Sequence, residues 1–171
     1  MVWTEMALGV MIAIAAWTDW QYQKISNKLL APAFVTALIL QGLLHGWSGI
    51  RSALLGTLAG LALLLIPYLL GGMGAGDVKF LAVIGSFGGA GFVVTSFLYG
   101  AILGGLIAVI LLVRRRALGA TFKHFLLLFP FINQKSILHE DVLAAHREKF
   151  PYGIALAAGT ALAMLWPLGV L

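Results

Sequence analysis

Two aspartates, Asp19 and Asp77, have the residue type and position that catalysis requires. Asp19 closes the first long apolar stretch of the chain, and Asp77 opens the fourth. An ionised carboxylate at membrane depth is costly and is retained mainly where it faces a cavity or a charged partner. The other four acidic residues lie near a terminus or in a polar segment, where solvation explains them: Glu5, Glu140, Asp141 and Glu148.

Two apolar stretches separate Asp19 from Asp77, so the chain returns to the membrane face that it left. We therefore expect both carboxylates at one face and at similar depth. If they come close, like-charge repulsion prevents both from ionising together, and the pair shares a proton. Aspartic peptidases use this arrangement, in which one carboxylate takes a proton from water and the other polarises the scissile carbonyl. The alternative is that each aspartate only caps a helix, since a helix N-terminus favours negative charge.

The segment 71–76 before Asp77 contains four glycines. Glycine leaves the backbone free of side chains and able to adopt positive φ, so an extended peptide could lie beside it. Irregular backbone at membrane depth is tolerated only where protein or a water-filled cavity satisfies it. A phosphate-binding loop is excluded, because the Rossmann and Walker spacings and a preceding strand are missing.

The elements that position these aspartates are predicted to be transmembrane helices. The chain is 61% apolar and 10% charged, whereas a soluble domain is about a quarter charged. Each span needs about 20 apolar residues. We predict an all-α integral membrane protein forming a single domain over 1–171, with a bundle of about six spans: 2–18, 29–46, 53–70, 78–88, 92–113 and 153–170. The first is expected to be a retained span, because no basic flank or small-residue cleavage site marks a signal peptide.

Basic residues determine the expected orientation, since they favour cytoplasmic loops. If the loop after Asp19 is cytoplasmic, ten basic residues lie inside and only Arg51 lies outside. The ten are Lys24, Lys28, Lys79, Arg114, Arg115, Arg116, Lys123, Lys135, Arg147 and Lys149. Within the segment 114–150, the apolar run 125–132 is too short to span. We expect a cytoplasmic interfacial segment there, because a seventh span would export Lys135, Arg147 and Lys149.

Several strings in the chain resemble one known family. Gly74-Ala75-Gly76-Asp77 matches the Gly-x-Gly-Asp signature of membrane-embedded aspartyl peptidases, and 72–79 resembles its type IV prepilin peptidase version. Asp19 is followed by Ile25 and Asn27, which is similar to the family's Asp with Ile-Pro-Asn downstream, although Ser26 replaces the proline. The string 149–153 resembles the family's closing Pro-Tyr/Phe-Gly/Ala element.

The resemblance implies a peptidase that removes the short leader from type IV prepilins or pilin-like precursors at the cytoplasmic face of the inner membrane. Asp19 and Asp77 would be the catalytic pair, with Gly74, Gly76 and Lys79 binding substrate. The residue before the cut is glycine in this family. The sequence lacks the cysteines and length of the methylating members, so it resembles the short, peptidase-only Flp/Tad type. An archaeal preflagellin peptidase is similar in plan.

The sequence leaves two rival functions open. A transporter or channel could use both aspartates as a proton relay, and a membrane scaffold subunit would need neither. We expect no metal or cofactor, since the chain has no cysteine and its four histidines lack metal-ligand spacing. The expected partners are a pilin-like substrate and membrane lipid, with no nucleic acid. Lys79 could bind a substrate carboxylate, tune the aspartates or anchor the interface, and Asn27 could cap a helix or orient Asp19.

Overall fold

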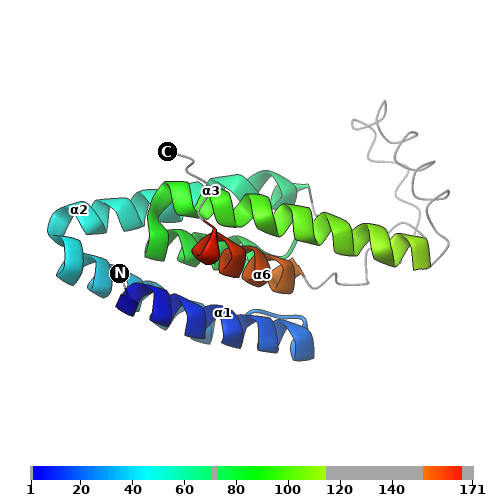
Figure 1. Cartoon of the computed structure of the whole chain (residues 1–171), viewed down its shortest axis with the longest axis horizontal. Helices are drawn as coiled ribbons and strands as arrows, with labels where there is room; N and C mark the ends of the chain where they lie inside the picture. Colours follow the sequence, from blue (N-terminus) through cyan, green and yellow to red (C-terminus); the bar gives the residue numbers. More distant parts are fainter. Residues whose placement is uncertain (1, 71–72, 115–151, 167–171) are drawn as a thin grey trace. The chain divides into compact units, whose positions relative to one another are not determined.

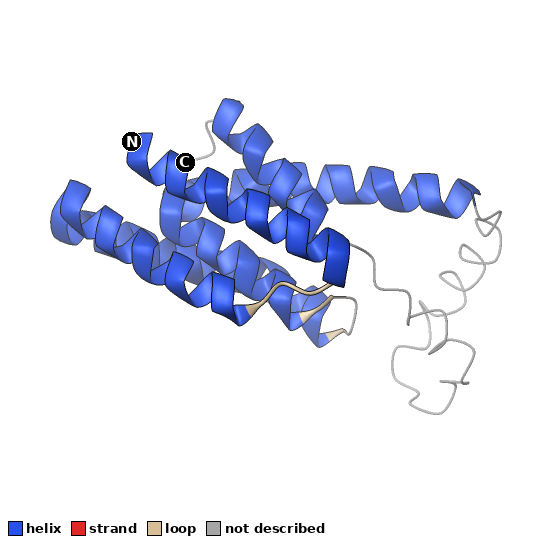
Figure 2. Cartoon of the chain, turned by 90° about the horizontal axis from the view of Figure 1, so that it is seen from below, coloured by secondary structure: helices blue, strands red, loops and turns tan. Residues whose placement is uncertain are grey.

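The computed structural model describes residues 2–70, 73–114 and 152–166, and all of the regular structure in these ranges is α-helical. The helices are α1 (Val2–Tyr22), α2 (Asn27–Leu69), α3 (Ala75–Arg114) and α6 (Tyr152–Leu165) (Figure 1). Figure 2 shows the short loop that joins α1 to α2, and there is no strand among the described residues. The all-α class predicted from the sequence is therefore confirmed.

Glycine breaks divide α2 and α3. Gly46 has φ 60° and ψ −142°, and Gly89 has φ 80° and ψ −176°. Both φ values are positive, a conformation that glycine adopts without the steric cost of a side chain. The chain reverses direction at each break (Figure 1). Both breaks lie where the sequence predicted the end of one span and the start of the next.

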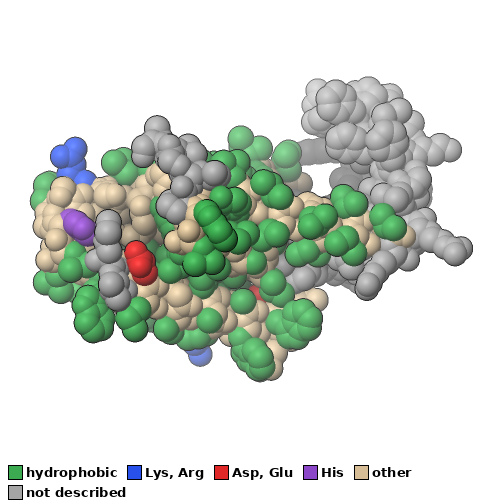
Figure 3. Space-filling model, in the orientation of Figure 1, with side chains coloured by type: hydrophobic (Ala, Val, Ile, Leu, Met, Phe, Trp, Pro, Cys, Tyr) green, Lys and Arg blue, Asp and Glu red, His purple; other side chains and the backbone are tan. Residues whose placement is uncertain are grey.

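The long helices are apolar enough to cross a membrane. Two candidate spans are found in the described residues, Asn27–Leu69 and Ala75–Ile110. Many large apolar side chains point outward, including Leu43, Leu58 and Ile102. Figure 3 shows hydrophobic side chains spread over the visible face of the helices. An outer surface of this kind is expected for helices in contact with lipid tails.

Small residues allow the helices to approach closely. A Cβ at Gly56 would lie 2.0 Å from the carbonyl oxygen of Gly85, and one at Gly60 would lie 2.6 Å from that of Leu81. The second part of α2 therefore packs directly on the first part of α3. Gly56 and Gly60 therefore serve helix packing.

The chain divides into two compact units, residues 1–104 with 151–171 and residues 105–150. In the first unit, α1 packs against α2 and α6. Its buried core includes Leu8 and Met11 of α1, Leu30 of α2, Phe80 of α3 and Leu156 of α6. The expected interfacial segment lies outside the described residues, apart from Arg114 at the end of α3. The site described below belongs entirely to the first unit.

Candidate active site

Asp19 lies in the last turn of α1 and is only 5% exposed. The backbone N–H of Ile154, in the first turn of α6, donates a hydrogen bond to its Oδ2 at 3.2 Å. The N–H groups of a first turn have no partner within their own helix. The Asp19 carboxylate accepts the hydrogen bond of one such N–H, that of Ile154, and so joins the end of α1 to the start of α6.

Asp77 is the third residue of α3. Its Oδ2 accepts a hydrogen bond from the N–H of Gly74 at 3.3 Å, while its own N–H donates to the Gly74 carbonyl at 3.1 Å. A carboxylate at this position that binds the N–H just before the helix is half of a capping box. Asp77 therefore does cap its helix, as the alternative sequence interpretation proposed.

The two aspartates are also brought together. Their carboxylates lie close enough for the charge of Asp19 to act on Asp77. Ile25, in the loop between α1 and α2, contacts the surroundings of both. Its backbone oxygen would lie 3.5 Å from a Cβ on Gly76, and its Cδ1 would lie 2.9 Å from a Cβ on Gly153. Capping and pairing are thus compatible in this structure.

The residues predicted to bind substrate lie at the same end of the bundle. Gly74 is exposed, and a Cβ there would meet only the Asp77 carboxylate and backbone of Gly76. Gly76 faces Ile25, so part of the room beside it is occupied by the chain itself. Lys79 is exposed, and its ammonium donates a hydrogen bond to Oδ1 of Asn27 at 3.3 Å.

Asn27 does not cap α2, contrary to one of its two expected roles. The N-cap is Ser26, whose hydroxyl accepts from the N–H of Lys28. Ser26 occupies the position at which the family that the sequence resembles has proline. Serine is well suited to an N-cap. Asn27 instead receives the hydrogen bond from Lys79 and so links the first turns of α2 and α3.

The first turn of α6 was missed as part of the site. Ile154 binds Asp19, Gly153 packs on its carboxylate, and the phenol of Tyr152 lies within electrostatic range of Asp77. Tyr152 is half-buried against the core, whereas Trp3 and Trp166 are exposed. In the sequence, only the string 149–153 indicated that this segment matters, and it did not reveal which residues the segment contacts.

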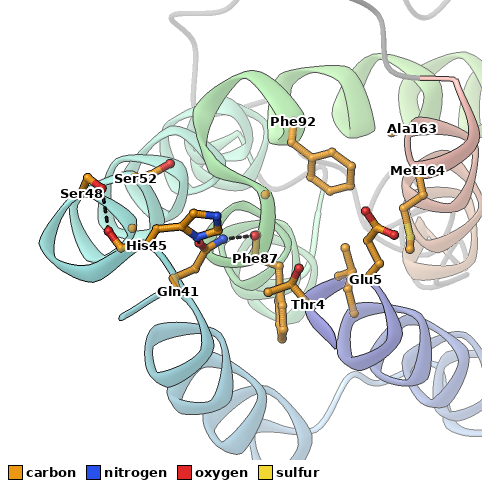
Figure 4. Close-up of a pocket in the computed structure, with 13 residues that line it drawn as sticks. Thr4, Glu5, Gln41, His45, Ser48, Ser52, Phe87, Phe92, Ala163 and Met164 are labelled. Carbon is orange, nitrogen blue, oxygen red and sulfur yellow. Dashed lines mark hydrogen bonds between the residues drawn. The ribbon is translucent and has the colours of Figure 1, made fainter. Parts of the chain in front are cut away.

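The cavity found in this unit lies elsewhere. It has a volume of about 620 Å³ and is lined by Glu5 of α1, Gln41 and His45 of α2, Phe92 of α3 and Met164 of α6, among others. Figure 4 shows the His45 ring and the Glu5 carboxylate on different sides of it. Glu5 lies in the first turn of α1, whereas Asp19 lies in its last turn. Gln41 donates to the carbonyl of Phe87, two residues before the break in α3. This cavity therefore lies beside the helix breaks and not beside the paired aspartates.

No metal site accompanies the aspartates in the part of the chain that the structure describes. Across residues 2–70, 73–114 and 152–166, no three His, Asp or Glu side chains group closely enough to hold an ion. The chemistry available to Asp19 and Asp77 is proton transfer to and from a substrate or water.

Comparison with known proteins identifies the chain. The model of the type IV leader peptidase family matches residues 6–109, more than half of the chain, including both aspartates. No curated protein and no solved structure matched. The family is one of peptidases, and the apolar helices agree with a place in the membrane. The chain belongs to the type IV leader peptidase family.

Proposed function

We propose that this protein is a membrane aspartyl endopeptidase that removes the short leader peptide from type IV prepilins or pilin-like precursors. The observation that carries the proposal is the pairing of Asp19 with Asp77. Two carboxylates from separate helices, α1 and α3, interact electrostatically within a chain of the leader peptidase family. A pair of this kind can hold one proton between its members.

One proton between two carboxylates is what peptide hydrolysis by this mechanism needs. The ionised member accepts a proton from water as the water oxygen bonds to the scissile carbonyl carbon, and the protonated member donates to the carbonyl oxygen. When the carbon–nitrogen bond breaks, the carboxyl that took the proton from water donates it to the leaving amine, and the other carboxylate takes a proton from a hydroxyl of the tetrahedral intermediate. The products are two peptide fragments, and the pair again holds one proton.

Three further residues are proposed to bind the substrate. Gly74 is exposed and leaves the backbone beside Asp77 free of a side chain, so an extended peptide has room to lie there, while Gly76 is partly covered by Ile25. Lys79 is exposed two residues after Asp77. Its ammonium has three donors, of which one is directed at Asn27. The others are available for a carboxylate of the substrate.

We propose that the end of the bundle with the aspartates faces the cytoplasm and that the chain crosses the inner membrane about six times. Lys24, Lys28 and Lys79 accompany the aspartates at that end, whereas Arg51 follows the α2 break. Basic residues favour the cytoplasmic side. When the segments on either side of Gly46 and Gly89 are counted separately, the described helices comprise six segments, which supports the proposed number of crossings.

The test is direct cleavage. The purified chain, in lipid nanodiscs, is incubated with a full-length prepilin, and the products are identified by mass spectrometry. We expect a single cut that releases the leader and is unaffected by chelators. The Asp19→Asn and Asp77→Asn variants serve as matched inactive controls. An intact precursor after prolonged incubation with several prepilins, including the Flp/Tad class, would contradict the proposal.

The relay alternative makes a different prediction. A proton-coupled transporter would show proton flux in liposomes that is lost in both Asn variants, with no precursor cut. The breaks in α2 and α3 do not favour it, because they lie near the cavity and not beside the aspartates.

A further inference from the structure

The first turn of α6 contacts the proposed catalytic pair although it lies outside the residues that the family model matches. The match ends at residue 109, and α6 begins at Tyr152. Within its first three residues, Ile154 donates its N–H to Asp19, and Tyr152 lies within electrostatic range of Asp77. One short segment therefore contacts Asp19 and also lies within electrostatic range of Asp77.

The approach of this turn requires glycine at position 153. A Cβ there would lie 2.8 Å from Oδ2 of Asp19, 2.9 Å from its Cγ and 2.9 Å from Cδ1 of Ile25. These distances are shorter than real Cβ contacts, so any side chain would displace the Asp19 carboxylate or Ile25. With glycine, the turn lies against the carboxylate and limits the directions in which it can point.

The hydrogen bond from Ile154 also acts on the charge that the pair must carry. An N–H donor stabilises the ionised form of a carboxylate, and the positive end of the helix dipole adds to it. Without such stabilisation, the two carboxylates would repel each other if both were ionised. Among the described residues, the charge of Asp19 acts on Asp77 of α3, and the charge of Asp77 acts in turn on Tyr152 of α6.

We propose that Gly153 and Ile154 are positioning residues that hold the Asp19 carboxylate in place for its reaction with Asp77. The inference rests on the proposed peptidase function and extends it to an element outside the family match. α6 then completes the active site: its backbone fixes one aspartate, and glycine at 153 leaves the carboxylate of that aspartate undisplaced.

The test removes one N–H. Ile154 is the third residue of α6, so its N–H is not required by the helix, and proline is tolerated in a first turn. Ile154→Pro therefore removes the donor to Asp19, while Ile154→Ala removes the same apolar side chain and keeps the donor. Gly153→Ala tests the steric requirement. All three are compared with the unaltered chain in nanodiscs.

The expected result is a loss of cleavage with a change in its pH profile. Ile154→Pro and Gly153→Ala should cut the precursor at least about tenfold more slowly, and Ile154→Ala, which keeps the N–H donor, should lose less activity than Ile154→Pro. In Ile154→Pro, the pH at which activity falls on the acid side should rise by about one unit, a tenfold change in proton affinity. Equal losses at every pH in Ile154→Pro, or an unchanged rate, would overturn the proposal.

A second measurement does not depend on cleavage. Hydrophobic carbodiimides react with protonated carboxyl groups, so the extent of Asp19 modification against pH can be read by peptide mass spectrometry. Its midpoint should rise by about one pH unit in Ile154→Pro and stay unchanged in Ile154→Ala. An unchanged midpoint in Ile154→Pro would refute the positioning role even if cleavage were lost. An unaltered chain that cuts no precursor would refute the peptidase function, and the carbodiimide result would still decide the role of α6.

Discussion

At the residue scale, the carboxylates of Asp19 and Asp77 each accept a hydrogen bond from a backbone N–H and also interact with each other. Asp19 accepts from Ile154, and Asp77 accepts from Gly74. Hydrogen bonds of this kind reduce the cost of holding carboxylates near the membrane. Helix capping therefore supplies the stability that lets two like charges remain close, and the two interpretations of these aspartates describe one arrangement.

The pair should behave as one catalytic unit. Asp19→Asn and Asp77→Asn should each slow precursor cleavage by on the order of a thousandfold or more, because each removes a proton acceptor or donor that the other cannot replace. The double variant should be no slower than either single one. Initial rates measured by gel densitometry across a range of enzyme concentrations provide the comparison.

Glu5→Gln is the matched control, since Glu5 is an acidic residue of α1 that lines the cavity away from the pair. Its rate should equal that of the unaltered chain. If the losses from the two single substitutions multiplied in the double variant, Asp19 and Asp77 would act independently, and the shared-proton mechanism would be wrong.

At the element scale, the close packing of α2 on α3 makes a stability prediction. In Gly56→Ala, the new methyl group would lie 2.0 Å from the backbone carbonyl of Gly85, which cannot rotate away. Overpacking of this kind costs about 1–3 kcal/mol. The midpoint of thermal unfolding in detergent should fall clearly.

Gly9→Ala in α1 provides the control for helix propensity. A Cβ at Gly9 meets nothing within 4 Å, and alanine favours a helix more than glycine does. Its unfolding midpoint should be unchanged or slightly higher. If Gly56→Ala unfolded at the same temperature as Gly9→Ala, the direct contact between α2 and α3 would be contradicted.

The sequence predicted the helices and the aspartates better than it predicted their surroundings. Apolar runs and the positions of Asp19 and Asp77 follow from local composition, and Gly46 and Gly89 fall where turns were expected. The contact of Ile154 with Asp19 joins residues 135 positions apart. It is made by a backbone N–H, which no residue type reveals, so sequence reasoning had no means of finding it.

The role of Gly76 illustrates the same limit. Its place next to Asp77 predicts room for a peptide, but the structure puts Ile25 on that side. A glycine in a motif shows that a side chain would be harmful without showing what it would meet. Only the packing of the α1–α2 loop answers that question.

At the scale of the whole molecule, the proposed orientation can be tested with single cysteines, because the chain has none of its own. Lys28 lies at the start of α2, and Ser48 follows the break at Gly46, and both are exposed. In oriented membranes, Lys28→Cys should react with an impermeant maleimide only from the cytoplasmic side, and Ser48→Cys only from the opposite side.

A cysteine in place of Lys135 extends this test to the segment outside the described residues. The six-span topology requires labelling from the cytoplasmic side. Labelling from the opposite side would indicate a seventh span between 114 and 150 and would contradict the predicted topology.

The position of the aspartates at one end of the helices also limits the substrate. A pair near the membrane surface reaches a peptide bond there and not one at mid-bilayer, so the precursor should hold its apolar helix in the membrane with its leader outside it. The peptide must enter beside Gly74, where the carboxylate of Asp77 is close to the backbone.

Replacing the glycine before the cut with leucine should therefore slow cleavage at least about a hundredfold, about 2.7 kcal/mol in the transition state. An alanine-to-leucine change about ten residues further along the apolar helix should alter the rate less than about threefold, because that position lies away from the pair. Rates from mass spectrometry of both precursors in the same nanodiscs provide the measurement, and equal cleavage of the two would show that no close approach limits the residue before the cut.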